Sequence, residues 1–153
     1  MTDRIEKTIE ISAPITKVPI TKVWHALTDY VEFGKWFGVK LDGPFIPGEV
    51  STGRITYPGY EHIKWEVKVK QLVEPKLFSF TWHPYAHDAT VDYSAETPTL
   101  VEFRLEPTVQ GTRLSMVETG FESLPIHRQP DALRMNDSGW TEQLANVRAH
   151  VEA

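Results

Sequence analysis

The chain has 153 residues, and its 16 lysines and arginines against 21 aspartates and glutamates give a formal net charge of −5. This acidic balance, without a basic cluster, argues against nucleic-acid partners, and no apolar run approaches the roughly 18 residues that membrane insertion as a helix needs. The chain contains no cysteine, which excludes disulfides, thiolate-ligated metals and a thiol nucleophile.

The first predicted elements are a strand and two short helices. Residues 5–11 alternate isoleucine with polar residues, which is typical of a half-buried strand. Residues 14–18 and 19–23 are identical copies of Pro-Ile-Thr-Lys-Val. Because proline is tolerated in a first helical turn, we expect the second copy to begin a helix and the first copy to extend the loop before it. Residues 29–39 predict a second, aromatic helix.

Strands fill the middle of the chain. Alternating apolar and polar residues, separated by glycine and proline turns, predict strands at 49–57, 60–73, 77–82, 99–107 and 112–121. In the longest of these runs the same alternation places Val73 on the apolar side. Residues 83–98 are predicted to form a long polar loop. From Pro130 onward the apolar residues share one helical stripe, which predicts a long final helix.

These elements predict an α+β fold within a single domain over residues 1–153. Short turns between successive strands favour an antiparallel meander. One face of such a sheet is polar and solvated, and the apolar face needs a cover. We expect the final helix to supply that cover.

Short motifs follow one another in a characteristic order along nearly the whole chain. They are Ala13-Pro14, Val23-Trp24-His25-Ala26-Leu27-Thr28-Asp29, Lys35-Trp36-Phe37-Gly38, Trp65-Glu66-Val67, Phe78-Ser79-Phe80-Thr81-Trp82, Gly111-Thr112-Arg113-Leu114, Glu118-Thr119-Gly120-Phe121 and Gly139-Trp140. In this order they resemble the START-like (SRPBCC) superfamily, and within it the proteins similar to the C-terminal domain of the activator of the heat-shock-protein-90 ATPase. The resemblance implies a helix-grip fold, in which a curved antiparallel sheet wraps around the long C-terminal helix and encloses a cavity.

Aromatic side chains from separate elements are expected to face the gap between the sheet and the final helix. They are Trp36, Phe37, Trp65, Phe80, Trp82 and Trp140. An ordinary large core explains them as well as a ligand cavity does. The cavity interpretation rests on two facts: binding pockets are mostly apolar with a few placed polar groups, and an indole buries its ring while offering its N–H.

Glu118 is the most informative polar residue. It shares strand parity with Leu114 and Met116, which predicts that it faces the interior, although a position at the strand end would let it reach solvent. A buried carboxylate is costly unless it is paired or hydrogen-bonded. Arg54 is a candidate partner, because the parity of its own strand allows it to face the same cavity. Together these two residues would orient a polar group of a ligand.

Metal and catalytic motifs are weak in this sequence. His83 and His87 are four residues apart, but Pro84 disfavours the helix that would bring both imidazoles together, so we predict an exposed loop without a metal. The chain has no nucleophile-elbow, phosphate-loop, dinucleotide or zinc-protease motif, and we expect no cofactor. An acid–base pair in the cavity would suffice for a cyclase, and nothing selects among its candidates, which are Glu118, Tyr57, Tyr60 and His83.

Three functions are therefore compatible with the sequence. The first is a cytoplasmic, non-catalytic carrier or sensor, monomeric or weakly dimeric, that binds an apolar, aromatic or lipid-like small molecule in the cavity. The second, implied by the resemblance, is a stress protein that acts on a chaperone through its surface. The third is a cyclase- or hydrolase-type enzyme that uses the same cavity, which we favour least.

Overall fold

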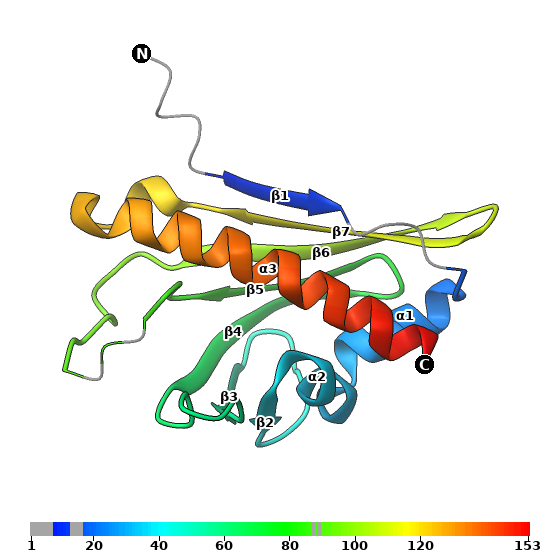
Figure 1. The fold of residues 1–153 in the computed structure, drawn as a ribbon, viewed down its shortest axis with the longest axis horizontal. Helices are drawn as coiled ribbons and strands as arrows, with labels where there is room; N and C mark the ends of the chain where they lie inside the picture. The colour runs from blue at the N-terminus through cyan, green and yellow to red at the C-terminus, as the bar shows by residue number, and fades with distance from the viewer. Residues whose placement is uncertain (1–7, 13–16, 87, 89) are drawn as a thin grey trace, which may run out of the picture.

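In the computed structural model an antiparallel sheet curves around a long C-terminal helix (Figure 1). The structure describes residues 8–12, 17–86, 88 and 90–153. The strands are β1 (Thr8–Ser12), β2 (Val39–Leu41), β3 (Val50–Ile55), β4 (Lys64–Val73), β5 (Leu77–Trp82), β6 (Thr99–Thr108) and β7 (Gly111–Thr119). The helices are α1 (Ile20–Thr28), α2 (Tyr30–Phe37) and α3 (Gln129–Glu152), with short 3₁₀ turns η2 (Phe121–Ser123) and η3 (Ile126–Arg128) before α3.

The order of strands in the sheet is β1-β7-β6-β5-β4-β3-β2, and all neighbours are antiparallel. Consecutive strands from β2 to β7 are neighbours, as a meander requires, and β1 closes the far edge beside β7. Helix α3 runs across the sheet, and α1 and α2 lie near its C-terminal end (Figure 1). The α+β helix-grip prediction is confirmed. No helix in the described part of the chain combines the length and the apolar character needed to cross a bilayer.

Two details of the sheet differ from the prediction. Strand β2 lies within and just after the segment that predicted the second helix, because α2 ends at Phe37 and Gly38 adopts a left-handed conformation with φ of 89°. In β4 the register with β5 shifts between Val69 and Gln71. Such a bulge reverses the side-chain alternation beyond it. Val73, predicted on the apolar side, is therefore 47% exposed.

The junction of α1 and α2 follows from local sequence. Helix α1 begins directly after Pro19, so the second pentapeptide copy opens the helix as predicted. Residues 14–16 of the first copy lie outside the described residues. Asp29 ends α1 and caps α2, because its side chain accepts a hydrogen bond from the Glu32 N–H at 3.0 Å. The Trp36 indole N–H donates to the Ala26 carbonyl at 2.8 Å and fixes the two helices against each other.

The core lies between the sheet and the helices and is rich in aromatic rings. Phe33 of α2 is fully buried at its centre, with ring centroids of Trp36, Phe37, Phe45 and Trp65 at 4.6–5.4 Å. Edge-to-face and stacked pairs of this kind stabilise by about 0.5–1.5 kcal/mol each beyond the burial of their surface. The core therefore joins α2, β4 and the loop before β3 into one unit.

Candidate functional site

The aromatic residues predicted to line a cavity do come together between the sheet and α3. The Trp82 ring centroid lies 5.7 Å from that of Trp65 on β4 and 5.5 Å from that of Trp140 on α3. Phe37 of α2 lies 5.0 Å from Trp65 and 6.1 Å from Trp140. Trp36 and Phe80 complete this aromatic cluster, at 5.8 Å from Phe37 and 5.7 Å from Trp65, respectively. Because the rings touch one another, the centre of the cluster is filled by its own side chains.

Glu118 is fully buried in the middle of this cluster. The sequence left two positions open for Glu118, the interior and a strand end that reaches solvent, and the structure shows the interior one. Its Oε2 accepts hydrogen bonds from the Trp82 indole N–H at 2.8 Å and the Thr99 hydroxyl at 2.5 Å. Its Oε1 accepts from the Trp140 indole N–H at 2.8 Å and the Asn136 side-chain amide at 2.9 Å.

One carboxylate oxygen of Glu118 accepts hydrogen bonds from the sheet, and the other accepts them from α3. Trp82 and Thr99 are direct cross-strand partners on β5 and β6, so the sheet supplies both donors to Oε2. Asn136 and Trp140 are four residues apart on α3, where side chains at that spacing share one helix face, so the helix supplies both donors to Oε1. The carboxylate therefore ties α3 to the sheet at one point.

All four partners of Glu118 are neutral. A carboxylate removed from water costs several kcal/mol, and hydrogen bonds to a charged group return about 1.5–3 kcal/mol each. Both indole N–H groups are obligatory donors with no acceptor capacity, and the site orients them toward an acceptor-only group. We therefore describe Glu118 as the residue that positions the two indoles.

The expected pairing of Glu118 with Arg54 is wrong. Arg54 is exposed on β3, and its neighbours across the sheet are Lys40 and Lys64. The inward positions of β3 are those of Ser51 and Gly53 instead, and the Trp65 indole N–H donates to the Ser51 hydroxyl at 3.2 Å. Arg54 is therefore not part of the aromatic cluster.

Sequence reasoning missed Thr99 and Asn136 as partners of Glu118. The sequence could have indicated Asn136, because it precedes Trp140 by four residues and therefore lies on the same face of the predicted helix. It could not have indicated Thr99, because the place of Thr99 opposite Trp82 depends on the length and path of the loop between β5 and β6.

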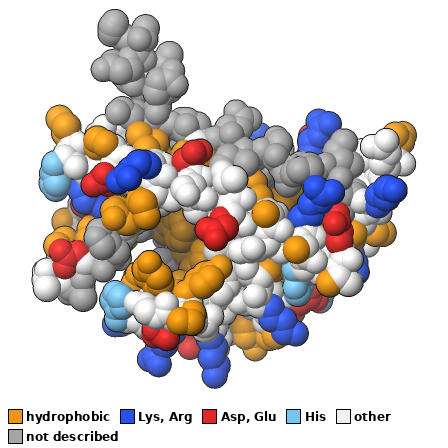
Figure 2. Space-filling view, viewed as in Figure 1, with side chains coloured by type: hydrophobic (Ala, Val, Ile, Leu, Met, Phe, Trp, Pro, Cys, Tyr) orange, Lys and Arg blue, Asp and Glu red, His pale blue; other side chains and the backbone are white. Residues whose placement is uncertain are grey.

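One end of the sheet–helix gap is open on the molecular surface. Figure 2 shows a hollow with hydrophobic side chains around it, between the N-terminal half of α3, the β5–β6 loop and the connected ends of β3 and β4. Trp82, at the end of β5, is the one indole of the Glu118 network that is only partly buried. Because β5 ends at Trp82 and continues into the β5–β6 loop, which borders the hollow, this end of the cluster is the one nearest to solvent.

Arg128 holds the β5–β6 loop against the beginning of α3. Its guanidinium donates to both carboxylate oxygens of Glu96, at 3.0 and 2.7 Å, and to the carbonyls of Tyr85 and Pro84 at 3.0 and 2.9 Å. It also lies 4.6 Å from the centre of the Tyr93 ring. The side chains of Arg128 and Glu96 are 11% and 13% exposed, so the ion pair is largely shielded from water. The prediction that His83 and His87 do not form a metal site stays a prediction, because His87 lies outside the described residues.

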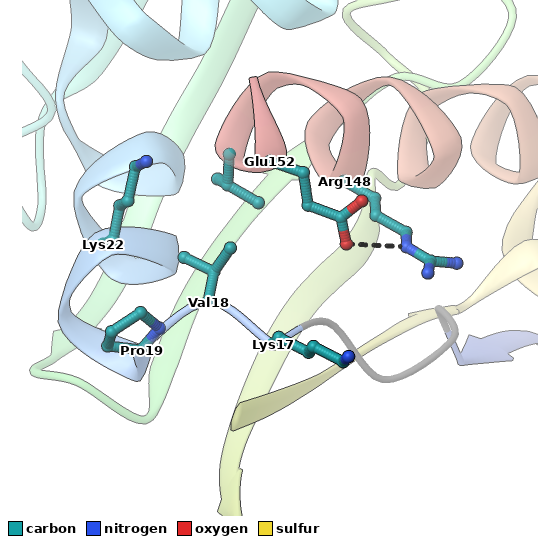
Figure 3. Close-up of a pocket in the computed structure, with 7 residues that line it drawn as sticks. Lys17, Val18, Pro19, Lys22, Arg148 and Glu152 are labelled. Carbon is teal, nitrogen blue, oxygen red and sulfur yellow. Dashed lines mark hydrogen bonds and ion pairs between the residues drawn. The ribbon is translucent and has the colours of Figure 1, made fainter. Parts of the chain in front are cut away.

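A second pocket lies at the opposite end of α3. It has a volume of about 570 Å³ and is formed by residues before α1 and by the last turns of α3. Figure 3 shows Lys17 and Lys22, which occupy equivalent positions in the two pentapeptide copies, on this rim with the Arg148–Glu152 ion pair facing them. Described residues of both pentapeptide copies therefore line this pocket.

Comparison with known protein families shows to which family the chain belongs. A model of the activator of Hsp90 ATPase homolog 1-like proteins matches residues 17–152. The chain belongs to this family. Comparison with curated proteins gives no significant match for this member of the Hsp90 ATPase activator-like family.

Solved structures agree with the family assignment. Protein MLL2253 from Mesorhizobium loti is 25% identical, with a TM-score of 0.74 over 95% of this chain and 96% of that one. The Aha1 dimer from Colwellia psychrerythraea is 20% identical, with a TM-score of 0.70 over 95% and 96% of the two chains. DynU16, from the dynemicin biosynthetic locus, is 16% identical with a TM-score of 0.72, and the match spans 96% of this chain but 48% of DynU16. At these identities the last two comparisons show a shared fold.

Proposed function

We propose that the protein binds a small apolar molecule with an aromatic ring at the hollow end of the aromatic cluster, as a non-catalytic carrier or sensor. The observation that carries this proposal is the position of Trp82. Trp82 is partly exposed at the end of β5, directly before the β5–β6 loop that borders the hollow, and its N–H donates to Glu118 at 2.8 Å. A fixed aromatic surface binds a planar ligand without the entropic cost of ordering a mobile side chain.

The other members of the cluster would support the ligand from behind. We assign Trp65 and Trp140 to the wall next to Trp82, and Trp36, Phe37 and Phe80 to the packing that holds this wall. We assign Glu118 a positioning role, because each of its oxygens already accepts two hydrogen bonds. This saturation argues against Glu118 as a general base, and so against the cyclase alternative.

Tryptophan fluorescence tests the proposal directly. We expect 2-naphthol to change the emission saturably and dodecanoate to act more weakly, because only the first ligand stacks on an indole. Trp82→Phe should weaken 2-naphthol binding at least tenfold. The matched control is Trp24→Phe, since Trp24 is a buried indole of α1 outside the aromatic cluster.

Two results would reject this function. One is the absence of any saturable response to either compound. The other is equal weakening of binding by Trp82→Phe and Trp24→Phe, which would indicate a general loss of structure.

The family assignment supports a second proposal, in which the surface of the protein contacts the Hsp90 chaperone. Pull-down of purified Hsp90 by this chain, undiminished by Trp82→Phe, would favour this function over ligand binding. The Colwellia relative is described as a dimer, and we propose weak homodimerisation here as well, measurable by light scattering over a range of concentrations. Cytoplasmic residence remains part of the proposal and agrees with a chain that contains no cysteine.

A further inference from the structure

Three potential metal ligands lie together on the surface where α1, α2 and the end of α3 come together, and a fourth, His150, contacts one of them. His25 lies in the last turn of α1, Asp29 between α1 and α2, Glu32 in the first turn of α2, and His150 in the last turn of α3. His25 Nε2 lies 2.8 Å from Glu32 Oε2, and His150 Nε2 lies 3.0 Å from Glu32 Oε1. The Glu32 carboxylate thus stands between two imidazoles from different helices.

The fold gathers these side chains for simple reasons. His25, Asp29 and Glu32 are spaced i, i+4 and i+7, and α2 begins directly after Asp29, which ends α1. Ligand atoms of these three residues all lie within 4.8 Å of one another. Within the part of the chain that the structure describes, no other three histidine, aspartate or glutamate side chains gather so closely. His150 joins them from a position 118 residues later, because the C-terminal end of α3 packs on α1 and α2.

We propose that His25, Asp29, Glu32 and His150 bind one divalent transition-metal ion of the zinc type. Imidazole nitrogen together with carboxylate oxygen suits Zn²⁺ and its neighbours, whereas Mg²⁺ and Ca²⁺ prefer oxygen ligands alone. A tetrahedral site with bonds of about 2.0–2.1 Å has edges of roughly 3.3 Å. The two nitrogen–oxygen distances of 2.8 and 3.0 Å are near this edge length but involve different oxygens of Glu32. The ligand atoms of His25, Asp29 and Glu32 lie within 4.8 Å of one another, a group that does not include His150, so the His150 imidazole must turn toward the other three ligands to bind the same ion.

Charge and access also fit a divalent ion. Two neutral imidazoles and two carboxylates carry a charge of −2, which a divalent cation neutralises. Asp29 uses Oδ2 to cap α2, so we assign Oδ1 to the metal. The side chains of His25, Glu32 and His150 are 62%, 31% and 25% exposed, which leaves a path for the ion from solvent. The bound ion would join the C-terminal end of α3 to α1 and α2.

Binding of Zn²⁺ and Co²⁺ to the full chain tests this site. We expect one Zn²⁺ per chain in a chelator-competition titration, and a visible absorption band typical of tetrahedral coordination when Co²⁺ replaces it. His25→Gln and His150→Gln should each weaken Zn²⁺ binding at least tenfold, since each removes one ligand. His62→Gln, at an exposed histidine in the connection between β3 and β4, is the matched control and should leave binding unchanged.

A second readout guards against variants that merely unfold. The His25 side chain is more exposed than those of Glu32 and His150, so His25→Gln should retain the melting temperature of the metal-free protein. Zn²⁺ should raise the melting temperature of the natural chain and not that of the variant, because only the folded state assembles the site. Equal Zn²⁺ binding by the natural chain, His25→Gln and His150→Gln would overturn the proposal. So would the absence of saturable binding.

Discussion

Replacing Glu118 by glutamine changes one acceptor oxygen into an amide nitrogen at a position where both oxygens accept hydrogen bonds. On either side of the carboxylate one partner can adapt. The Thr99 hydroxyl can turn to accept from the new amide, and the Asn136 side chain can flip to present its oxygen. Neither indole can adapt, because its N–H only donates. Glu118→Gln should therefore leave one indole N–H, of Trp82 or Trp140, without an acceptor.

The size of the effect follows from that single unpaired group. A buried donor without a partner costs about 1–3 kcal/mol, and for a chain of this size each kcal/mol lowers the melting temperature by about 2–4 °C. We expect Glu118→Gln to melt roughly 2–12 °C below the natural protein. Glu118→Leu should lose more, about 3–5 kcal/mol, because both indoles and both smaller partners lose their acceptor.

Urea unfolding followed by circular dichroism measures these differences. Glu122→Gln is the matched control, because Glu122 is exposed just beyond β7 and should change the unfolding free energy by less than about 0.5 kcal/mol. If Trp82 is the indole left without an acceptor, the double variant Glu118→Gln, Trp82→Phe removes that unpaired N–H. The loss of unfolding free energy in the double variant should then be smaller than the sum of the losses in the two single variants. A Glu118→Gln protein as stable as the natural chain would refute the idea that the carboxylate ties α3 to the sheet.

Three further predictions concern other parts of the molecule. Arg128→Met should lower the unfolding free energy by about 3 kcal/mol and expose the β5–β6 loop to limited proteolysis, and an unchanged cleavage pattern would contradict the role of this guanidinium. Gly38→Ala should cost about 2–3 kcal/mol and Gly48→Ala only about 1 kcal/mol. Both glycines have positive φ, but only at Gly38 would the added methyl group clash with another residue, because it would lie 2.6 Å from the Tyr57 ring. Equal losses of unfolding free energy in the two variants would contradict this explanation. The Ser94 hydroxyl and N–H hold the pKa of the Asp92 carboxyl below its ordinary value, so Ser94→Ala should raise that pKa in an NMR titration, and no change would reject the assignment.

Much of the fold could be predicted because it depends on local alternation. The strand alternation that places Leu114, Met116 and Glu118 on one side is a property of the backbone, and it put Glu118 on the inward face, although a strand end that reaches solvent stayed open as an alternative. The stripe of α3 predicted its covering role for the same reason. The aromatic cluster could be predicted as well, because large rings at inward positions of several elements all pack into the same core.

The side on which Arg54 lies could not be predicted from its own strand. Residues 50–56 contain few apolar side chains on either parity, so the alternation is ambiguous. The neighbouring strands decide it: Trp65 and Leu41 lie opposite Gly53, where an added side-chain carbon would come within 2.5 Å of the Lys40 carbonyl. Gly53 therefore takes an inward position and Arg54 an outward one.

The sequence by itself determined the order of elements, the class of fold and the strand face on which Glu118 lies, because each depends on the periodicity of neighbouring residues. Only the tertiary structure decided which donors meet Glu118 and that His150 reaches Glu32 from the other end of the chain. Such contacts join residues far apart in sequence, and their distances depend on the packing of α3 across the whole sheet. No local pattern carries that information.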